Sequence, residues 1–199
     1  MQNSENKLTR LLVNRKKIRV IGFDDAPFEK KPGTTVYLTG VVCSDTRFEG
    51  MLYDRTTKDG NDATKVIIEM LRESKFLPQL NIILLDGIAV GGFNIIDLAE
   101  LHAAFGLPCV AVMRKTPNLS SIKRALQHFA DKKEKIEKIA NAGEIHNIGG
   151  FIFQVVGAGI TDTAKVLARL TDNGKVPEAL RLAHLIGSAI MTGESGKRA

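Results

Sequence analysis

Acidic residues stand at the ends of two apolar segments of the sequence. Asp24 and Asp25 follow the apolar run 18–23, and Asp86 follows the run 82–85. Both runs have the apolar, partly β-branched composition of buried strands. Ligands of open α/β sheets lie beyond the carboxyl ends of the strands, so adjacent strands bring Asp24 and Asp86 to one place. We therefore expect paired carboxylates at one edge of a sheet.

A third carboxylate is expected from the loop that precedes the first predicted helix, which carries Asp54, Asp59 and Asp62. Two or three carboxylates in close contact repel one another when ionised, and a divalent cation relieves that repulsion. Oxygen ligands select Mg²⁺ or Mn²⁺ over zinc. The predicted metal ligands are thus Asp24, Asp86 and one of these loop aspartates. The chemistry that uses such a site is phosphodiester hydrolysis.

Basic residues and glycines follow the same predicted strand ends. Arg114 and Lys115 come directly after the apolar run 109–113, where a cation helps to neutralise a scissile phosphate. The glycine-rich loop 86–94 has two interpretations. The first is a flexible connection whose last residue caps the next helix. The second is a phosphate-binding loop, because glycine lets backbone N–H groups approach a phosphate. On that interpretation the phosphate-binding candidates are Gly87, Gly91, Gly92 and Asn94.

The same aspartates also have structural interpretations. Asp25 is placed to cap the turn that follows it, and Asp59 with Gly60 is a common turn pair. Asp62 precedes a helical pattern and suits an N-cap. The metal interpretation therefore depends on which strand ends meet, and this follows from the order of the elements.

The pattern of apolar segments predicts a mixed α/β fold. Fully apolar crossover strands are typical of a parallel sheet covered on both faces, whereas the three opening strands form an antiparallel meander. This order is that of a ribonuclease H-like core, a mixed sheet with helices on both faces. The predicted strands lie near residues 18–25, 35–43, 47–54, 81–87 and 109–113, the first long helices near 62–74 and 95–105, and a strand pair near 144–156.

Length and composition favour one cytoplasmic domain. The chain has 199 residues, and we expect a single domain over 1–199 with a polar N-terminal extension over 1–17. No apolar run approaches the roughly 20 residues that span a bilayer, and no signal-peptide pattern opens the chain, so no membrane partner is expected. Cys43 and Cys109 lie in apolar strands, as buried reduced thiols do. The net charge of +6 suits a polyanion such as DNA or RNA.

The remaining polar residues have ordinary structural interpretations. His102 and His184 fall among apolar helix residues, where we expect them to pack rather than to act in catalysis. The charged run 132–138 is typical of a solvated helix face. Thr161 is expected to cap the first of two closing helices. Phosphate contacts and surface solubility both explain the basic clusters, which are residues 15–17, 30–31 and 197–198.

Four segments of the chain resemble one archaeal family. The family is known as domain of unknown function 99 and is regarded as homologous to endonuclease V. The resemblance covers nearly the whole chain, and the segment 85–94 is its most specific part. The four segments are 21–28 (IGFDDAPF), 59–64 (DGNDAT), 85–94 (LDGIAVGGFN) and 181–184 (RLAH).

The resemblance implies a nuclease of ribonuclease H-like fold. Endonuclease V uses a Mg²⁺ site to cut nucleic acid near deaminated bases such as inosine. The resemblance gives metal roles to Asp24, Asp86 and one of Asp59 and Asp62, and it makes Arg114 or Lys115 the cation on the phosphate side. Endonuclease V carries a Pro-Tyr-Ile-Pro wedge before its first long helix, and this chain has no proline or aromatic residue over 54–61.

Three hypotheses of different classes follow, and the last of them is a purely structural partner in a complex that repairs DNA or processes RNA. The first is a metal-dependent nuclease or other phosphodiesterase acting on DNA or RNA, for which the retained carboxylates argue. The second is a nucleic-acid or nucleotide binding protein with the same fold and a degenerate site. The missing wedge argues for the second function. So does an aspartate where endonuclease V has glutamate, since a side chain shorter by one methylene moves a metal ligand.

Overall fold

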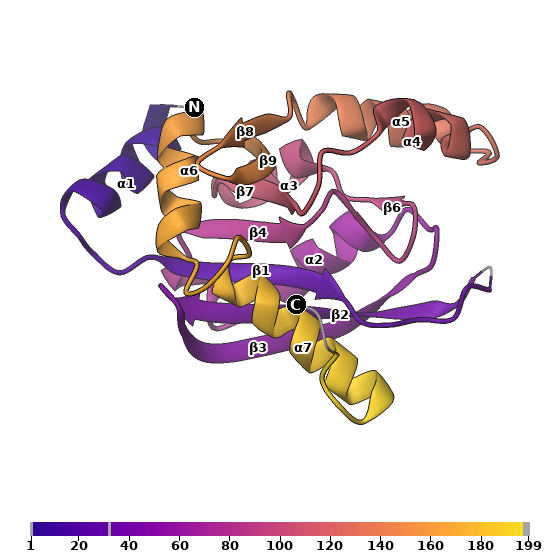
Figure 1. The fold of residues 1–199 in the computed structure, drawn as a ribbon, viewed down its shortest axis with the longest axis horizontal. Coiled ribbons are helices and arrows are strands. Elements are labelled where there is room, and N and C mark those ends of the chain that lie inside the picture. The colour runs from indigo at the N-terminus through magenta and orange to yellow at the C-terminus, as the bar shows by residue number, and fades with distance from the viewer. Residues whose placement is uncertain (1, 32, 197–199) are drawn as a thin grey trace.

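A mixed seven-stranded sheet organises the chain. The computed structural model describes residues 2–31 and 33–196. Within them the strand order is β3-β2-β1-β4-β7-β9-β8 (Figure 1). β1, β2 and β3 form an antiparallel meander, β4 and β7 run parallel to β1, and β9 and β8 continue antiparallel. The predicted meander and parallel crossover strands are confirmed. The strands are β1 (Arg19–Asp25), β2 (Thr35–Ser44), β3 (Arg47–Thr57), β4 (Ile82–Asp86), β7 (Cys109–Met113), β8 (His146–Ile148) and β9 (Phe151–Val156).

Helices cover both faces of the sheet, as predicted. α6 and α7 pack on one face, called the α7 face below, together with α1. α2 and α3 pack on the opposite face, called the α2 face, and α5 contacts α3 there. Figure 1 shows α6 and α7 in front of the sheet. The helices are α1 (Gln2–Val13), α2 (Ala63–Arg72), the 3₁₀ turn η1 (Leu77–Gln79), α3 (Leu98–Phe105), α4 (Leu119–Leu126), α5 (Lys132–Asn141), α6 (Ile160–Arg169) and α7 (Glu178–Thr192).

The alternation of side chains along β1 and β4 decides where the two aspartates point. Ile21 and Phe23 of β1 belong to the core on the α2 face, whereas Val20 belongs to the core on the α7 face. Because side chains alternate along a strand, Asp24 points toward the α7 face. Leu84 of β4 lies in the core of the α7 face, so Asp86, two residues later, points the same way. The two carboxylates therefore lie on one face at neighbouring strand ends.

Glycine lets α7 lie directly on β1. A Cβ placed on Gly22 would be 2.8 Å from the carbonyl carbon of Ala179 and 2.8 Å from the backbone nitrogen of Leu180. Any side chain at this position would push the helix away from the strand. The missing side chain therefore sets the distance between β1 and α7, and α7 also carries His184.

Three local expectations are wrong. Residues 2–13, expected within a polar extension, form α1, whose Leu8 is completely buried. α3 begins at Leu98 rather than near residue 95, because Asp97 caps it by accepting a hydrogen bond from the Glu100 N–H at 3.0 Å. Gly159 rather than Thr161 is at the N-cap position of α6. Amphipathic spacing in α1 and competing polar residues near the helix starts account for these shifts.

The charged run 132–138 is not a fully solvated helix face. Lys135 of α5 is completely buried. Its ammonium group donates to the carbonyl oxygen of Gly60 at 2.7 Å and to Oδ1 of Asn61 at 2.8 Å, and it pairs with Asp131 at 3.1 Å. A buried ammonium group needs such partners because losing its hydration is costly. One lysine of the run thus fastens α5 to the loop before α2.

Other expectations concern the cysteines and the termini. Cys43 and Cys109 are free and buried in β2 and β7, as predicted. Lys197 and Arg198, candidates for phosphate contacts, lie outside the described residues. None of the helices within residues 2–31 and 33–196 is long and apolar enough to cross a membrane.

Asp45 ties the turn between β2 and β3 to α6. Its carboxylate accepts hydrogen bonds from the Ile18 N–H at 3.0 Å and from Arg169 at 3.2 Å, and Lys17 lies 3.2 Å away. Burial alone raises the pKa of Asp45, but these donors outweigh burial and hold the pKa below its usual value. The ionised carboxylate therefore stabilises the folded state.

We expect Asp45→Asn to lower the free energy of unfolding at neutral pH by about 2 kcal/mol, the usual size of hydrogen bonds to a charged group. A carboxyl group with a lowered pKa stabilises the fold above its unfolded pKa of about 3.9, and this contribution is lost as the pH falls through the folded pKa. The difference between wild type and variant, measured by urea denaturation, should thus be full above about pH 5 and shrink below about pH 4. A difference that does not change with pH would contradict the role of the charge.

Candidate active site

Two carboxylates and one imidazole meet at the carboxyl ends of β1 and β4. Phe23 pairs with Leu85 in the parallel register, so Asp24 and Asp86 follow side by side. One ligand atom from each of Asp24, Asp86 and His184 lies within 4.8 Å of the other two. These three residues are called the Asp24 cluster below. The predicted juxtaposition of Asp24 and Asp86 is present in the structure.

His184 reaches the cluster from α7. Its Nδ1 lies 2.9 Å from Oδ2 of Asp24, and its side chain is partly exposed. The expectation that this histidine only packs in its helix is wrong, because the absence of a side chain at Gly22 brings α7 close to β1. The sequence did contain a signal that His184 matters, because the segment 181–184 is one of the four segments of the family resemblance. The residues that follow α7 return to the same place: a Cβ on Gly196 would lie 3.2 Å from Oγ of Ser188 and 3.9 Å from Nε2 of His184.

The electrostatics of the cluster show a surplus of negative charge. Burial is the main cause that raises the pKa of Asp24 to about 6, the hydrogen bond with His184 opposes the shift, and the neighbouring carboxylates of Asp86 and Asp25 add to it. The hydrogen bond with Asp24 in turn raises the pKa of His184. Burial also raises the pKa of Asp25, whose carboxylate accepts a hydrogen bond from the Gly91 N–H. A cation bound here would favour the ionised carboxylates.

A positively charged side chain lies beside the cluster. Nη2 of Arg114, the first residue after β7, lies 2.9 Å from Oδ2 of Asp86. The Arg114 side chain is 40% exposed, so its remaining N–H groups can reach a ligand. The next residue, Lys115, is exposed and forms no ion pair with any residue of 2–31 or 33–196. The two basic residues predicted at this strand end therefore lie at the same sheet edge as the carboxylates.

The loop carboxylates are not part of the cluster found among the described residues. Asp62 accepts hydrogen bonds from Oγ1 of Thr56 at 2.6 Å and Nδ2 of Asn94 at 2.6 Å. Burial alone raises the pKa of Asp62, but these hydrogen bonds outweigh burial and lower the pKa. Asp59 pairs with Lys58 and accepts a hydrogen bond from the Phe93 N–H at 2.9 Å. The prediction that one of these two aspartates completes the metal site is not supported, because both hold the loop before α2 in place.

The glycine-rich segment is also engaged within the protein. It forms a small hairpin of β5 (Ala89–Val90) and β6 (Asn94–Ile95) rather than a flexible connection. The Gly87 N–H donates to the Val112 carbonyl at 2.8 Å, and the Gly91 N–H donates to Asp25.

Asn94 is fully buried and bonded at both ends of its amide. Its Nδ2 donates to Thr56, Thr57 and Asp62, and its Oδ1 accepts from the Ala63 N–H at 3.2 Å. The phosphate-binding role predicted for Gly87, Gly91 and Asn94 is therefore not supported. Gly92 is exposed and has a φ of +90° beside Asp59, which places it in the turn of the hairpin.

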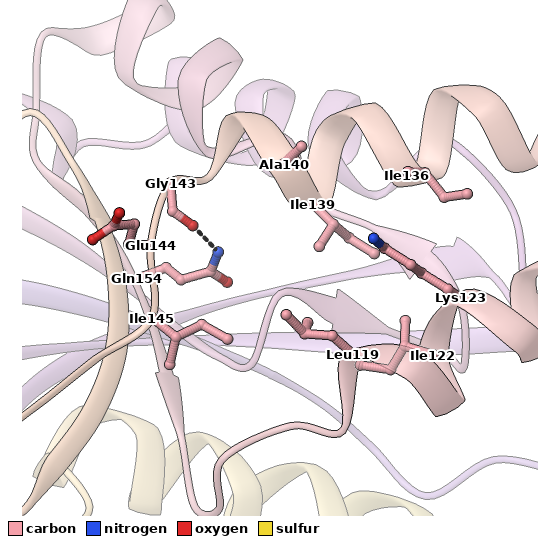
Figure 2. A pocket seen from close by; sticks show the side chains of 10 residues that line it. All are labelled: Leu119, Ile122, Lys123, Ile136, Ile139, Ala140, Gly143, Glu144, Ile145 and Gln154. Atoms are coloured by element: carbon pink, nitrogen blue, oxygen red, sulfur yellow. Dashed lines mark hydrogen bonds between the residues drawn. The ribbon is translucent and has the colours of Figure 1, made fainter.

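A separate hollow lies on the α2 face, away from the Asp24 cluster. It encloses about 520 Å³ between α4, α5 and the start of the β8–β9 hairpin. Figure 2 shows Leu119 and Ile122 facing Ile139 across it, with Gln154 at its inner end, where the Gln154 side chain donates to the Gly143 carbonyl at 2.7 Å. Gln154 pairs with Ala111, whose side chain belongs to the core of the α2 face. The sheet therefore separates this hollow from the two aspartates.

The fold is that of endonuclease V. Human endonuclease V superposes with a TM-score of 0.55 at 16% identity, covering 86% of this chain and 83% of that chain. Endonuclease V of Bacillus subtilis superposes with a TM-score of 0.58 at 12% identity, covering 88% of this chain and 81% of that chain. These similarities establish the architecture, a mixed α/β sheet with helices on both faces.

The sequence itself places the chain in a narrower group. Residues 16–191 match the endonuclease dU family, and the chain belongs to that family. A UPF0215 protein of Methanothermobacter thermautotrophicus is 40% identical over 186 residues, covering 91% of each chain. The crystal structure of a protein of unknown function from Archaeoglobus fulgidus superposes with a TM-score of 0.83 at 34% identity, covering 87% of this chain and 98% of that one. The resemblance to an uncharacterised archaeal family related to endonuclease V is confirmed.

Proposed function

We propose that the protein is a metal-dependent nuclease that cleaves phosphodiester bonds of DNA or RNA. The observation that carries this proposal is the Asp24 cluster, in which two carboxylates and an imidazole converge at the carboxyl edge of the sheet. Membership of the endonuclease dU family supports the same function. The side chains of Asp24 and Asp86 would hold Mg²⁺ or Mn²⁺, with His184 next to them.

The residues present fit a divalent cation. Carboxylate oxygens are the ligands that Mg²⁺ and Mn²⁺ prefer, and two of the three groups are carboxylates. The raised pKa of Asp24 reflects burial beside further negative charge, and a bound cation compensates that charge. When bound, such a cation lowers the pKa of a water molecule and neutralises charge on a phosphate.

The protein's own residues supply orientation and proton transfer. Asp24 engages Nδ1 of His184, which fixes the ring and leaves Nε2 as the nitrogen that exchanges a proton with a reacting group. Arg114 is held beside Asp86 with donors to spare for a phosphate oxygen. Asp25 binds the Gly91 N–H and so anchors the β5–β6 hairpin next to the cluster.

One observation favours a second function. Neither Asp59 nor Asp62 joins the cluster, so the third carboxylate expected for a nuclease of this type is engaged elsewhere in the described part of the chain. A protein of this fold with a weakened metal site would bind nucleic acid without cutting it. The two functions differ in cleavage and agree in binding.

The test is a cleavage assay on labelled DNA and RNA that are single-stranded, duplex, branched, or carry deoxyuridine or inosine. We expect cleavage of at least one substrate with Mg²⁺ or Mn²⁺ and none with EDTA. Calorimetric titration of Mn²⁺ provides a readout that does not depend on cleavage. Binding of nucleic acid without cleavage in either metal would identify the degenerate-site binding protein, and absence of Mn²⁺ binding would contradict the metal site itself.

A further inference from the structure

A second cleft lies next to the Asp24 cluster along the same edge of the sheet. It has a volume of about 290 Å³ and lies between the end of β7, the β8–β9 hairpin and the loop from α6 to α7. Arg114, Lys175 and Asn147 are its polar lining residues. This group is called the Lys175 cleft below.

Strand order places the cleft relative to the carboxylates. β4, β7, β9 and β8 are successive neighbours in the sheet (Figure 1). Neighbouring strands are about 4.8 Å apart, so the cleft, beyond the end of β7, lies one to two strand spacings from Asp86. Arg114 belongs to both places, because it contacts Asp86 at 2.9 Å and lines the cleft. A ligand that extends from the cluster past Arg114 therefore enters the cleft.

The cleft has the charge of an anion site. Its lining includes two basic side chains, an exposed amide and no carboxylate. Lys175 is exposed and makes no ion pair within the described part of the chain, so its charge is uncompensated there. Arg114 shares its charge with Asp86, but its fork of five donors leaves several N–H groups for another oxygen. Lysine and arginine are the residues that contact nucleic-acid phosphates most often.

A glycine turn lets Lys175 lie across the cleft. Gly150, at the tip of the β8–β9 hairpin, has a φ of +85°. A Cβ at this position would lie 3.4 Å from Cε and 3.6 Å from Nζ of Lys175. The lysine side chain therefore rests against the hairpin and does not extend freely into solvent. A partly fixed cation loses less conformational entropy on binding than a mobile one.

We propose that the Lys175 cleft binds the phosphodiester next to the one held at the Asp24 cluster. The nucleic-acid strand then runs along the carboxyl edge of the sheet, from the end of β1 toward β8. Arg114 lies between the two phosphates, and Lys175 with Asn147 binds the outer one. This inference rests on the proposed function, since it specifies the path of that substrate.

The test measures binding without cleavage. A labelled single-stranded oligonucleotide is titrated with the full-length protein in EDTA, and fluorescence anisotropy gives Kd over about 50 to 200 mM salt. We expect Lys175→Gln to raise Kd about 3- to 10-fold and to reduce the slope of log Kd against log salt by about 0.7, the contribution of one phosphate contact. Lys65→Gln is the matched control, because it removes the same charge from an exposed lysine on α2.

Three outcomes would overturn the proposal. The first is an unchanged Kd and salt slope in Lys175→Gln, and the second is an equal loss of affinity in Lys65→Gln, which would indicate only the net charge of the protein. The third is displacement of the oligonucleotide by inorganic phosphate at the same total phosphate concentration, which would assign the cleft to free phosphate. Failure of the proposed function would give a different result. The protein would then cleave no substrate, although its binding of the oligonucleotide in EDTA would still depend on Lys175.

Discussion

Replacing Asp86 by asparagine is expected to reduce metal-dependent cleavage by at least about 100-fold, because a bound cation contributes several kcal/mol of charge stabilisation and each 1.36 kcal/mol is a factor of ten. Asparagine has nearly the same shape, and it removes one of the two carboxylates of the cluster. The Asp86 side chain is only 15% exposed, so water cannot fully replace the lost charge. The change also removes the ion pair that holds Arg114.

Initial cleavage rates over a range of Mn²⁺ concentrations measure this loss, and calorimetry measures Mn²⁺ affinity in the same variant. Asp54→Asn is the control, because it removes an exposed aspartate of β3 whose carboxylate, among residues 2–31 and 33–196, accepts a hydrogen bond only from the next backbone N–H. Thermal unfolding of the variant separates loss of the site from loss of the fold. A rate within about tenfold of wild type, in a folded variant that still binds Mn²⁺ as wild type does, would exclude Asp86 from the metal site.

Gly22→Val is expected to lower the free energy of unfolding by about 3 kcal/mol, at the upper end of what overpacking costs. The first added carbon already lies 2.8 Å from two backbone atoms of α7, and backbone atoms cannot move aside as a flexible side chain can. The helix must shift away from β1. His184 moves with it, so we also expect Mn²⁺ affinity to fall in the fraction that remains folded.

Urea denaturation gives the change in stability, and Gly22→Ala should give a smaller loss because only one carbon is added. Thr35→Val is the control, since it places the same side chain at an exposed position of the neighbouring strand β2. A Gly22→Val protein as stable as wild type would mean that α7 does not depend on close contact with β1.

The sheet and two of the three residues of the cluster follow from local sequence patterns. Apolar runs that end in carboxylates mark β1 and β4, and the order of strands and helices makes these two strands neighbours, so Asp24 and Asp86 could be paired in advance. His184 could not be placed by pattern, because it lies 160 residues from Asp24 in the sequence and its helix spacing suits packing equally well. Its approach depends on a missing side chain at Gly22, which periodicity does not reveal.

The prediction that a loop carboxylate completes the metal site lacks support for a related reason. Asp59 and Asp62 have the residue type and the position along the chain that a metal ligand needs. Sequence spacing does not show that Thr56, Asn94 and the Phe93 N–H compete for the same oxygens. The burial of Lys135 is hidden in the same way, because two of its partners, Gly60 and Asn61, lie far from α5 in the chain.

The return of the chain toward His184 after α7 has a practical consequence for how the protein is produced. A Cβ on Gly196 would lie 3.2 Å from Oγ of Ser188 and 3.9 Å from Nε2 of His184. A flexible tag fused to the C-terminus is attached three residues beyond Gly196, and at up to about 3.5 Å per residue it is long enough to reach the carboxylates. A polyhistidine purification tag at that end therefore has additional imidazoles within reach of Asp24 and Asp86, where they compete for the same cations. Metal titrations and cleavage assays are therefore best made with an affinity tag on the N-terminus, ahead of α1, or with the tag removed.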